Sequence, residues 1–397
     1  MRSLPPFRRC VFMLSLMLAA IPLSLPAQTG DKSKGADTLV LANGDTLHGK
    51  LIEEAAGTVT FHSDPLGDLT LSWDKIKELH SSESFAVMTP EMKKRNKRAA
   101  LDLPKGRVDV ADGLVTLHPE TGATIAPIPE KNAQVIVDAA ILDKQLNHEA
   151  GFLAGWNGAA TAGATLVSAT QNSYAVSGSV GLIRTMPTVS WLDPRNRTSF
   201  DFAGSFGKIT QPGYTSGGVF TPATTTKSSI LHFDAERDEY VSSRVFALGQ
   251  AAFDHNYSQD LDLQQIYGGG LGWTMLKTPK QEGDLKATMQ YEKQQFITGS
   301  SSANQNLIGS TFSANYLLKL KLVTYTQSLA FIPAYNNERA YSATETDTFA
   351  FPAYKNLSFS VGTLDSYLND PPLTAPPTKR NSFEFTMGLT YAIKSKY

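Results

Sequence analysis

The sequence predicts an all-β protein, a transmembrane antiparallel up-and-down β-barrel of about twelve strands preceded by a small β-rich domain. Apolar and polar residues alternate along most of residues 150–397, and the connections between these segments alternate between short and long. Charged residues make up 18% of the 397-residue chain, below the roughly 25% of ordinary soluble domains. The net charge of −1 argues against a nucleic-acid binder that relies on bulk positive charge.

The first 27 residues have the composition of a secretory signal peptide. Arg2, Arg8 and Arg9 precede an apolar run over residues 11–25, which is shorter than a membrane-spanning helix. We expect cleavage after Ala27 and a small polar tether over residues 28–36. The only cysteine, Cys10, would leave with the signal peptide. The mature chain would then form neither a disulfide nor a cysteine-ligated metal site.

Residues 37–149 predict a small β-rich domain that would lie in the periplasm. Short alternating segments flank Asn43-Gly44-Asp45, a turn sequence that joins hairpin strands because Asn and Gly tolerate positive φ. The spacing allows two small units, residues 37–90 and 105–149. The predicted strands are 38–41, 46–52, 57–61, 68–73, 107–110, 114–118 and 133–137, with a short helical turn or strand around Ile76 and Leu79.

A basic run separates these two segments. It contains Lys93, Lys94, Arg95, Lys97 and Arg98. Such a run could contact an anionic surface, but charge runs are usually solvated linkers or helix faces, and we favour that interpretation.

The barrel prediction for residues 150–397 rests on period-two alternation, which places successive side chains on opposite faces of a strand. In residues 382–393 one face carries Phe383, Phe385, Met387, Leu389, Tyr391 and Ile393. The other face carries serine, threonine, glycine, alanine and Glu384. The predicted strands are 156–166, 174–183, 199–207, 230–236, 245–253, 266–275, 285–292, 308–318, 323–331, 341–351, 357–367 and 382–393.

The connections predict which end of the barrel faces the periplasm, because outer-membrane barrels have short periplasmic turns and long outer loops. The predicted long connections are 210–226, 254–262, 293–303 and 366–380. The predicted short ones are 237–240, 277–282, residue 319 and 352–354. The connection over residues 186–196 is too long for a periplasmic turn and breaks this rule.

Two stretches of the barrel resemble the bacterial domain-of-unknown-function 481 family, whose members are called salt-induced outer-membrane proteins. They are Tyr267-Gly268-Gly269-Gly270-Leu271-Gly272-Trp273 and Tyr367-Leu368-Asn369-Asp370-Pro371-Pro372 with the later segment 385–391. The resemblance covers residues 150–397, and the stretch from Leu41 to Asp74 is similar to an extension found in some members. It implies a barrel in the outer membrane of a Gram-negative bacterium and no established catalytic chemistry.

The expected partners follow from that location. They are outer-membrane lipid and the outer-membrane assembly machinery, which reads a C-terminal strand ending in an aromatic residue, here Tyr397. We expect no nucleic-acid partner. The sequence does not indicate what the N-terminal domain binds.

No segment predicts a catalytic, cofactor-binding or metal-ligating residue. The seven histidines lack the spacing of known ligand sets, and residues 268–272 lack the Gly-Lys-Ser/Thr ending of a phosphate loop. These glycines are better explained as small residues that let the barrel wall bend or pack closely. A hydrolase site at the rim is the alternative, with His255 as general base beside Asp254, Asp260 or Ser258. A polar loop that carries one histidine is the favoured interpretation.

The phase of the alternation directs a set of ionisable side chains toward the lumen. They are Asp201, His232, Asp234, Glu236, Lys286, Glu292 and Glu384. They would line a selective water-filled channel or form a paired, plugged interior. The sequence therefore predicts an envelope-structural barrel or a passive channel for small solutes or ions. The alternatives are the outer-membrane hydrolase and a soluble secreted binding β-protein.

Overall fold

The computed structural model describes most of the chain after residue 35. The predicted signal peptide, the tether except Ala36, and the basic run lie outside the described residues. No helix among the described residues is long and apolar enough to cross a membrane. The described ranges are 36–55, 57–90, 103–119, 125–147, 151–168, 172–189, 191–216, 219–297, 304–371 and 380–395.

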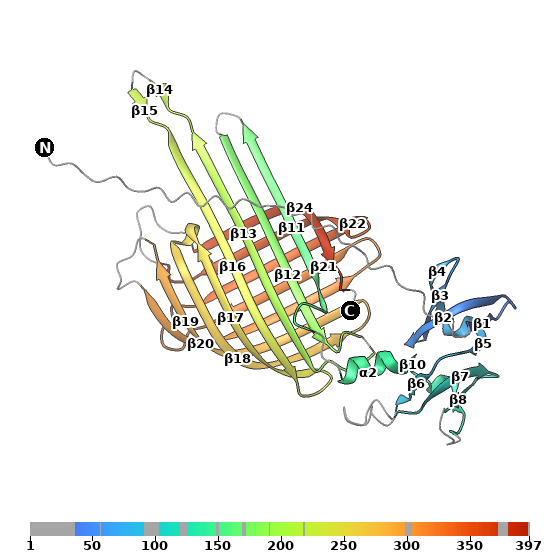
Figure 1. The fold of residues 1–397 in the computed structure, drawn as a ribbon. Coiled ribbons are helices and arrows are strands. Elements are labelled where there is room, and N and C mark those ends of the chain that lie inside the picture. The colour runs from blue at the N-terminus through green and yellow to red at the C-terminus, as the bar shows by residue number, and fades with distance from the viewer. Residues whose placement is uncertain are drawn as a thin grey trace.

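A closed antiparallel barrel forms the larger part of the molecule (Figure 1), and the predicted fold class is confirmed. Each strand pairs with its neighbours in sequence, and the last strand pairs with the first. The twelve strands are β11 (Trp156–Ser168), β12 (Asn172–Met186), β13 (Asn196–Gln211), β16 (Thr224–Tyr240), β17 (Val245–Asn256), β18 (Leu261–Lys277), β19 (Gln281–Phe296), β20 (Gln305–Lys319), β21 (Thr324–Ile332), β22 (Ser342–Tyr354), β23 (Leu357–Leu368) and β24 (Asn381–Ile393).

Every predicted barrel strand corresponds to one of these strands, but many extend further than predicted. The turn predicted at residues 237–240 is wrong, because the ladder between β16 and β17 continues to the pair Tyr240–Phe246 and the chain turns at residues 241–244. Arg237, Asp238 and Glu239 resemble turn residues in composition. They stay in the strand because their backbone groups pair with both neighbouring strands.

The predicted alternation is also observed. Phe383, Phe385 and Met387 on β24 point outward and are more than half exposed in the isolated chain. Side chains of the opposite phase meet inside the barrel. For example, Lys286 of β19 reaches Glu236 of β16, although two strands lie between them. Only side chains on the concave side of the wall can make such a contact.

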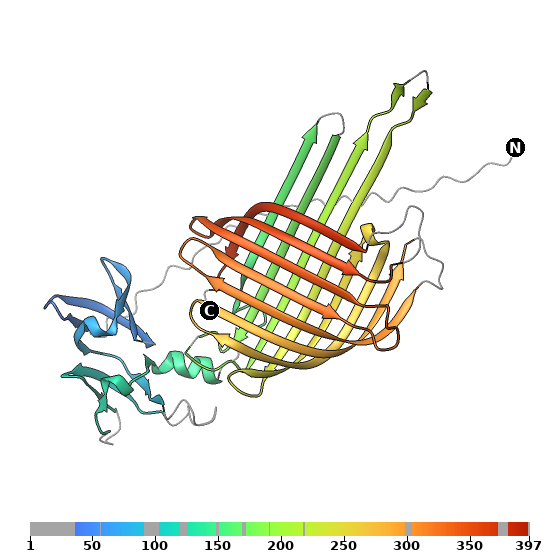
Figure 2. The same cartoon turned by 180° about the vertical axis from the view of Figure 1, so that it is seen from behind.

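The barrel has two unlike ends, which we call proximal and distal according to their distance from the N-terminal domain (Figure 2). Short turns at residues 241–244, 278–280, 320–323 and 355–356 lie at the proximal end, together with the connection 187–195. The distal connections include 212–223, with the hairpin of β14 (Tyr214–Ser216) and β15 (Val219–Thr221), and 257–260, with the helical turn η4 (Tyr257–Gln259). The long connection predicted at residues 254–262 is therefore wrong, because β17 and β18 both extend into it and leave only residues 257–260.

The N-terminal domain is one ten-stranded sheet followed by helix α2 (Ala139–Asn147). The Asp138 side chain accepts the Ala140 N–H at 2.7 Å and so caps α2. Two short helical turns, η1 (Trp73–Lys75) and η3 (Glu130–Asn132), connect strands. The strands are β1 (Asp37–Leu41), β2 (Thr46–Ala55), β3 (Thr58–Ser63), β4 (Gly67–Ser72), β5 (Ile76–His80), β6 (Phe85–Met88), β7 (Lys105–Ala111), β8 (Leu114–His118), β9 (Ile128–Pro129) and β10 (Val135–Asp138).

Segments 37–90 and 105–149 do not form two separate units. Strand β7 pairs with β5 and β6, and β10 pairs with β2 and β6, so both segments share one sheet and one core. The first half of β2 pairs with β1, and its second half pairs with β10. A register shift between Leu51 and Glu53 marks the bend. The alternation along each short segment does not reveal this long-range pairing.

The connection 187–195 is long because it docks the N-terminal domain on the barrel. Trp191 is 4% exposed and packs in a cluster with Met88, Val137 and Leu142. Its indole Nε1 donates a hydrogen bond to Glu53 Oε2 at 3.0 Å. Gln145 of α2 also donates to Thr188 Oγ1 at 2.9 Å. This connection therefore breaks the rule of short turns because it supplies an interface.

We predict that Trp191→Ala weakens this docking by about 3–5 kcal/mol, the usual cost of truncating a buried Trp. Limited proteolysis of the folded protein with trypsin should then cleave α2 after Lys144 faster than in the wild type. Trp191→Phe keeps the apolar contact and should fall between the two. The barrel itself should keep its heat-modifiable gel migration, and cleavage at the wild-type rate would contradict the assignment.

Glu54 is a buried carboxyl group in the core of the N-terminal domain. Its side chain is 1% exposed, and its Oε1 accepts the Gly57 N–H at 3.1 Å. No partner contacts Oε2 within the described part of the chain. Burial, with smaller contributions from Glu130 and Glu53, raises the pKa of Glu54 from 4.5 to about 7, although the Gly57 hydrogen bond opposes the shift.

A raised pKa in the folded state means that the unfolded chain releases this proton first. The stability of the N-terminal domain should therefore be highest below pH 4.5 and should fall as the pH rises toward 7. We predict that Glu54→Gln removes this fall and makes the domain more stable than the wild type at pH 8. Hydrogen exchange of the backbone amides of β2 and β10 at pH 5 and pH 8, corrected for intrinsic exchange rates, measures the stability of the domain at each pH. An equal pH dependence in both proteins would refute the prediction.

Candidate functional site

The lumen of the barrel is the candidate site, because it gathers the ionisable side chains that the sequence directed inward. The structure places all seven of them on the inward face of the wall. Five of them make contacts between strands: Lys286 with Glu236, His232 with Asp254, Glu292 with Gln264, and Glu384 with Ser205.

A buried charge cluster lies at the proximal end of the lumen. Arg197 of β13 contacts Asp238 Oδ2 and Asp284 Oδ2, each at 2.7 Å, and Glu282 Oε1 at 3.2 Å. The Arg197 side chain is 8% exposed, and its guanidinium lies 5.1 Å from the centre of the Phe246 ring. This cluster joins β13, β16 and β19 across the inside of the wall.

The glycine-rich stretch of β18 makes room for that cluster. A Cβ atom on Gly272 would lie 2.2 Å from the Phe246 ring, a distance that no real contact allows. Phe246 packs with Tyr240 and Leu248 beneath Arg197. Gly272 is therefore a packing residue, as the sequence predicted, and the stretch lies in a strand.

Polar side chains continue this packed wall toward the distal end. Lys286 Nζ lies 2.5 Å from Glu236 Oε1, and both side chains are almost fully buried. Further along, His232 Nδ1 lies 2.5 Å from Asp254 Oδ1. Near the distal end, Glu292 accepts hydrogen bonds from Gln264 and Gln294 at 2.5 and 2.6 Å.

The opposite wall has much smaller inward residues. Their side chains leave space opposite the bulky polar network of β13 to β19. They include Thr324, Thr326, Ser328, Thr344, Thr346, Thr348, Ser358, Ser360, Thr386 and Thr390. The lumen is thus asymmetric, with charge and bulk on one side and hydroxyl groups on the other.

Acidic groups dominate the inward charges of the described residues. The carboxylates are Asp201, Asp234, Glu236, Asp238, Asp254, Glu282, Asp284, Glu292 and Glu384, against the basic side chains of Arg197, His232, Lys277, Lys286 and Lys319. Asp201 and Asp234 lie directly opposite each other on β13 and β16. Like charges in such a pair repel each other, so a cation between or near them is favourable.

The proposed hydrolase pair does not assemble. Asp254 points inward to His232, whereas His255 points outward and bonds the Asp262 carbonyl oxygen through Nδ1 at 2.7 Å. Asp260 is buried in the turn after η4, and the Ser258 side chain lies outside the described part. Within the described residues, no group of three or more His, Asp or Glu side chains could hold a metal ion. Sequence reasoning missed the His232–Asp254 pair.

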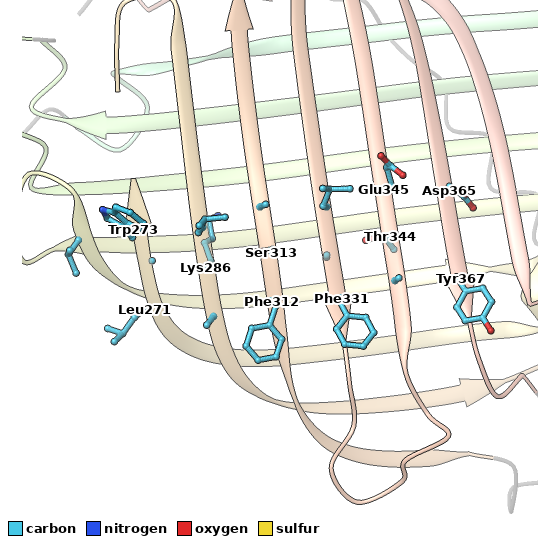
Figure 3. Close-up of a pocket in the computed structure, with 18 of the residues that line it drawn as sticks. Leu271, Trp273, Lys286, Phe312, Ser313, Phe331, Thr344, Glu345, Asp365 and Tyr367 are labelled. Carbon is cyan, nitrogen blue, oxygen red and sulfur yellow. The ribbon is translucent and has the colours of Figure 1, made fainter. Parts of the chain in front are cut away.

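A groove of about 830 Å³ lies on the outward face, across β17 to β24. Phe312, Phe331 and Tyr367 line it on the same side of the wall as Leu271 and Trp273 (Figure 3). Its lining is mostly apolar. Its acidic residues are Glu345 and Asp365, a directly opposed pair near the distal ends of β22 and β23. An apolar outward groove suits lipid chains rather than water-borne solutes.

Comparison with known proteins identifies a family. A family model described as "Protein of unknown function, DUF481" matches residues 160–393. No curated protein matches the chain. Among solved structures, the NanC porin is 7% identical with a TM-score of 0.33, covering 60% of this chain and 100% of that one.

Two further structures show the same kind of likeness. An outer-membrane channel from Pseudomonas putida F1 is 14% identical with a TM-score of 0.34, covering 62% of this chain and 98% of that one. A Pseudomonas aeruginosa FadL homologue is 10% identical with a TM-score of 0.22, covering 90% and 86%.

We predict that Arg197→Met destabilises the barrel by about 3–5 kcal/mol, because it leaves Asp238 and Asp284 buried without their cation. The temperature at which the folded band converts to the unfolded band on a denaturing gel should fall. Arg237→Met is the matched control, since Arg237 lies on the exposed outward face beside Glu239. Equal conversion temperatures for the two variants would contradict a structural role for the cluster.

Proposed function

Because the chain belongs to the DUF481 family, a family of unknown function, we propose an activity from its lumen: a passive outer-membrane pore for small solutes that prefers cations to anions. The observation that carries the proposal is the excess of inward carboxylates over inward cations. A narrow passage with low-dielectric walls concentrates the field of such charges, so cations are attracted and anions repelled.

The groups that face the open part of the lumen matter most. Arg197 and Lys286 are both held by carboxylates in the packed wall, so they add little positive potential. Asp201 and Asp234 have no lysine or arginine within ion-pair distance among the described residues. Glu384 bonds only to the neutral Ser205 hydroxyl in the contacts described. These three carboxylates would set the selectivity.

We also propose that the N-terminal domain lies in the periplasm. Four short turns lie at the proximal end, beside that domain, and most of the longer connections lie at the distal end, as in outer-membrane barrels. The longer distal connections are 212–223, 297–304, 333–341 and 369–380. The exposed aromatic and aliphatic side chains of the outward face support a lipid environment over a soluble secreted form. Among the alternatives, the rim hydrolase loses support because Asp254 and His255 point to opposite faces.

Reversal potentials in planar bilayers test the proposal. Across a KCl gradient, the wild type should pass potassium in clear preference to chloride. We predict that the double variant Asp201→Asn with Asp234→Asn lowers this preference several-fold, because it removes two lumen charges. Glu345→Gln is the matched control, since it neutralises a carboxylate on the outward face and should leave the preference unchanged.

Two results would overturn the proposal. A folded, heat-modifiable wild type that shows no conductance would indicate a closed structural wall. An anion preference, or an equal effect of the lumen and outward variants, would show that the inward carboxylates do not control passage.

A further inference from the structure

The distal mouth of the lumen is partly covered from inside. Gln259 of η4 is 3% exposed and donates hydrogen bonds to the carbonyl oxygens of Ser366 at 3.0 Å and Arg380 at 3.1 Å. Leu261, Phe296 and Leu368 form a buried cluster at the same place. Strands β17 and β18 are far from β23 and β24 around the barrel, so these contacts cross the lumen. A direct exit along the axis is therefore obstructed on this side.

The wall is weakest where the first and last strands meet. Strands β11 and β24 share five residue pairs, from Gly158–Ile393 to Ala162–Leu389. By contrast, β11 pairs with β12 along its whole length, from Trp156 to Ser168. The distal part of β11, after Ala162, and the part of β24 before Leu389 have no pairs with each other.

Glycines mark the point where the two strands separate. A Cβ atom on Gly163 would lie 2.4 Å from the Met387 carbonyl oxygen, and one on Gly388 would lie 2.3 Å from the Ala162 carbonyl oxygen. The backbones are therefore in direct contact there. Beyond this contact β11 rises with β12 while β24 crosses away from them (Figure 2). We call this unpaired segment of the seam between β11 and β24, in the distal half of the wall, the notch.

The residues along the notch are polar on the inward face of the wall and apolar on the outward face. On the inward side, the hydroxyl groups of Thr161 and Thr390 form a hydrogen bond at 2.8 Å. Glu384 lies on the same side and accepts a hydrogen bond from the Ser205 hydroxyl of β13 at 2.8 Å. On the outward side lie Ala162, Ala164, Phe385 and Met387. The Glu384 side chain therefore reaches from β24, on the lumen side of the notch, to β13.

We propose that this notch is a lateral passage, through which the polar head of an amphiphile moves between the lumen and the outer leaflet while its tail stays in the lipid. The inference rests on the proposed function, since the lumen must admit the head group. Unpaired backbone N–H and C=O groups are costly in lipid, and a polar head that bonds to them relieves this cost. The acidic lumen selects an uncharged or cationic head over an anionic one.

Two serine-to-cysteine variants separate lateral entry from entry through the mouth. Ser205 lies beside the notch, and Ser328 of β21 lies on the opposite wall, where it bonds Asn315 at 2.8 Å. Each thiol would be the only one in the mature chain, because Cys10 lies in the predicted signal peptide. The folded variants, checked by heat-modifiable migration, are placed in proteoliposomes and treated with three thiol reagents.

The reagents are a small water-soluble maleimide and two membrane-held probes with the same alkyl chain. Their reactive heads carry either a trimethylammonium or a sulfonate. We expect the water-soluble maleimide to label both cysteines. We expect the membrane-held probes to label Ser205→Cys and not Ser328→Cys, with the trimethylammonium probe several-fold faster than the sulfonate probe.

The outcomes distinguish the two proposals. If the maleimide labels both cysteines while the membrane-held probes label both equally or neither, the lateral passage is refuted and the pore stands. If the sulfonate probe reacts as fast as the trimethylammonium probe, the selection by head charge is refuted. If no reagent labels either cysteine, the lumen admits no solute and both proposals fail.

Discussion

Pairing of backbone hydrogen-bond groups is the constraint on which the rest of this structure depends. Strands that cross a lipid layer must direct every N–H and C=O group to a neighbouring strand, and only closure removes the two free edges. In this barrel the closure depends on the short ladder from Gly158–Ile393 to Ala162–Leu389. The wall is otherwise continuous from β11 to β24. Among the strand pairs of the wall, the seam between β11 and β24 therefore has the shortest ladder, and its distal half is unpaired.

The inside of the barrel follows from the same geometry, because every second side chain must find room or a partner in the lumen. One half of the wall solves this with paired charges: Arg197 is stabilised by Asp238 and Asp284, and Lys286 by Glu236. Such groups are costly to bury alone and acceptable when paired and hydrogen-bonded. Gly272 provides the space that Phe246 needs beneath them. The other half uses hydroxyl side chains, so an open region can remain beside a packed one.

Local pattern was enough to predict the barrel, whereas contacts between distant strands were not predictable from it. Period-two alternation located each barrel strand because it is a property of adjacent residues. The same rule shows that Asp254 and His255, as neighbours in an extended strand, must face opposite sides, so a longer predicted strand would have excluded their pairing. The pairing of His232 with Asp254 depends on the register between β16 and β17, which no single segment encodes. Strand β6 is buried on both faces, so it has no alternation to detect.

The unusual connection 187–195 shows how one departure from a pattern can carry information. A turn that only reverses the chain needs a few polar residues, but this one places Trp191 in the core cluster beside α2. Burial of an indole side chain, together with the Arg195 hydrogen bond to the Leu146 carbonyl oxygen at 3.0 Å, ties two β-systems that fold around separate cores. The proximal end of β12 and β13 is thus held by the N-terminal domain, while their distal ends lie next to the notch. A mechanical force on the N-terminal domain would therefore be transmitted to the barrel wall through β12 and β13.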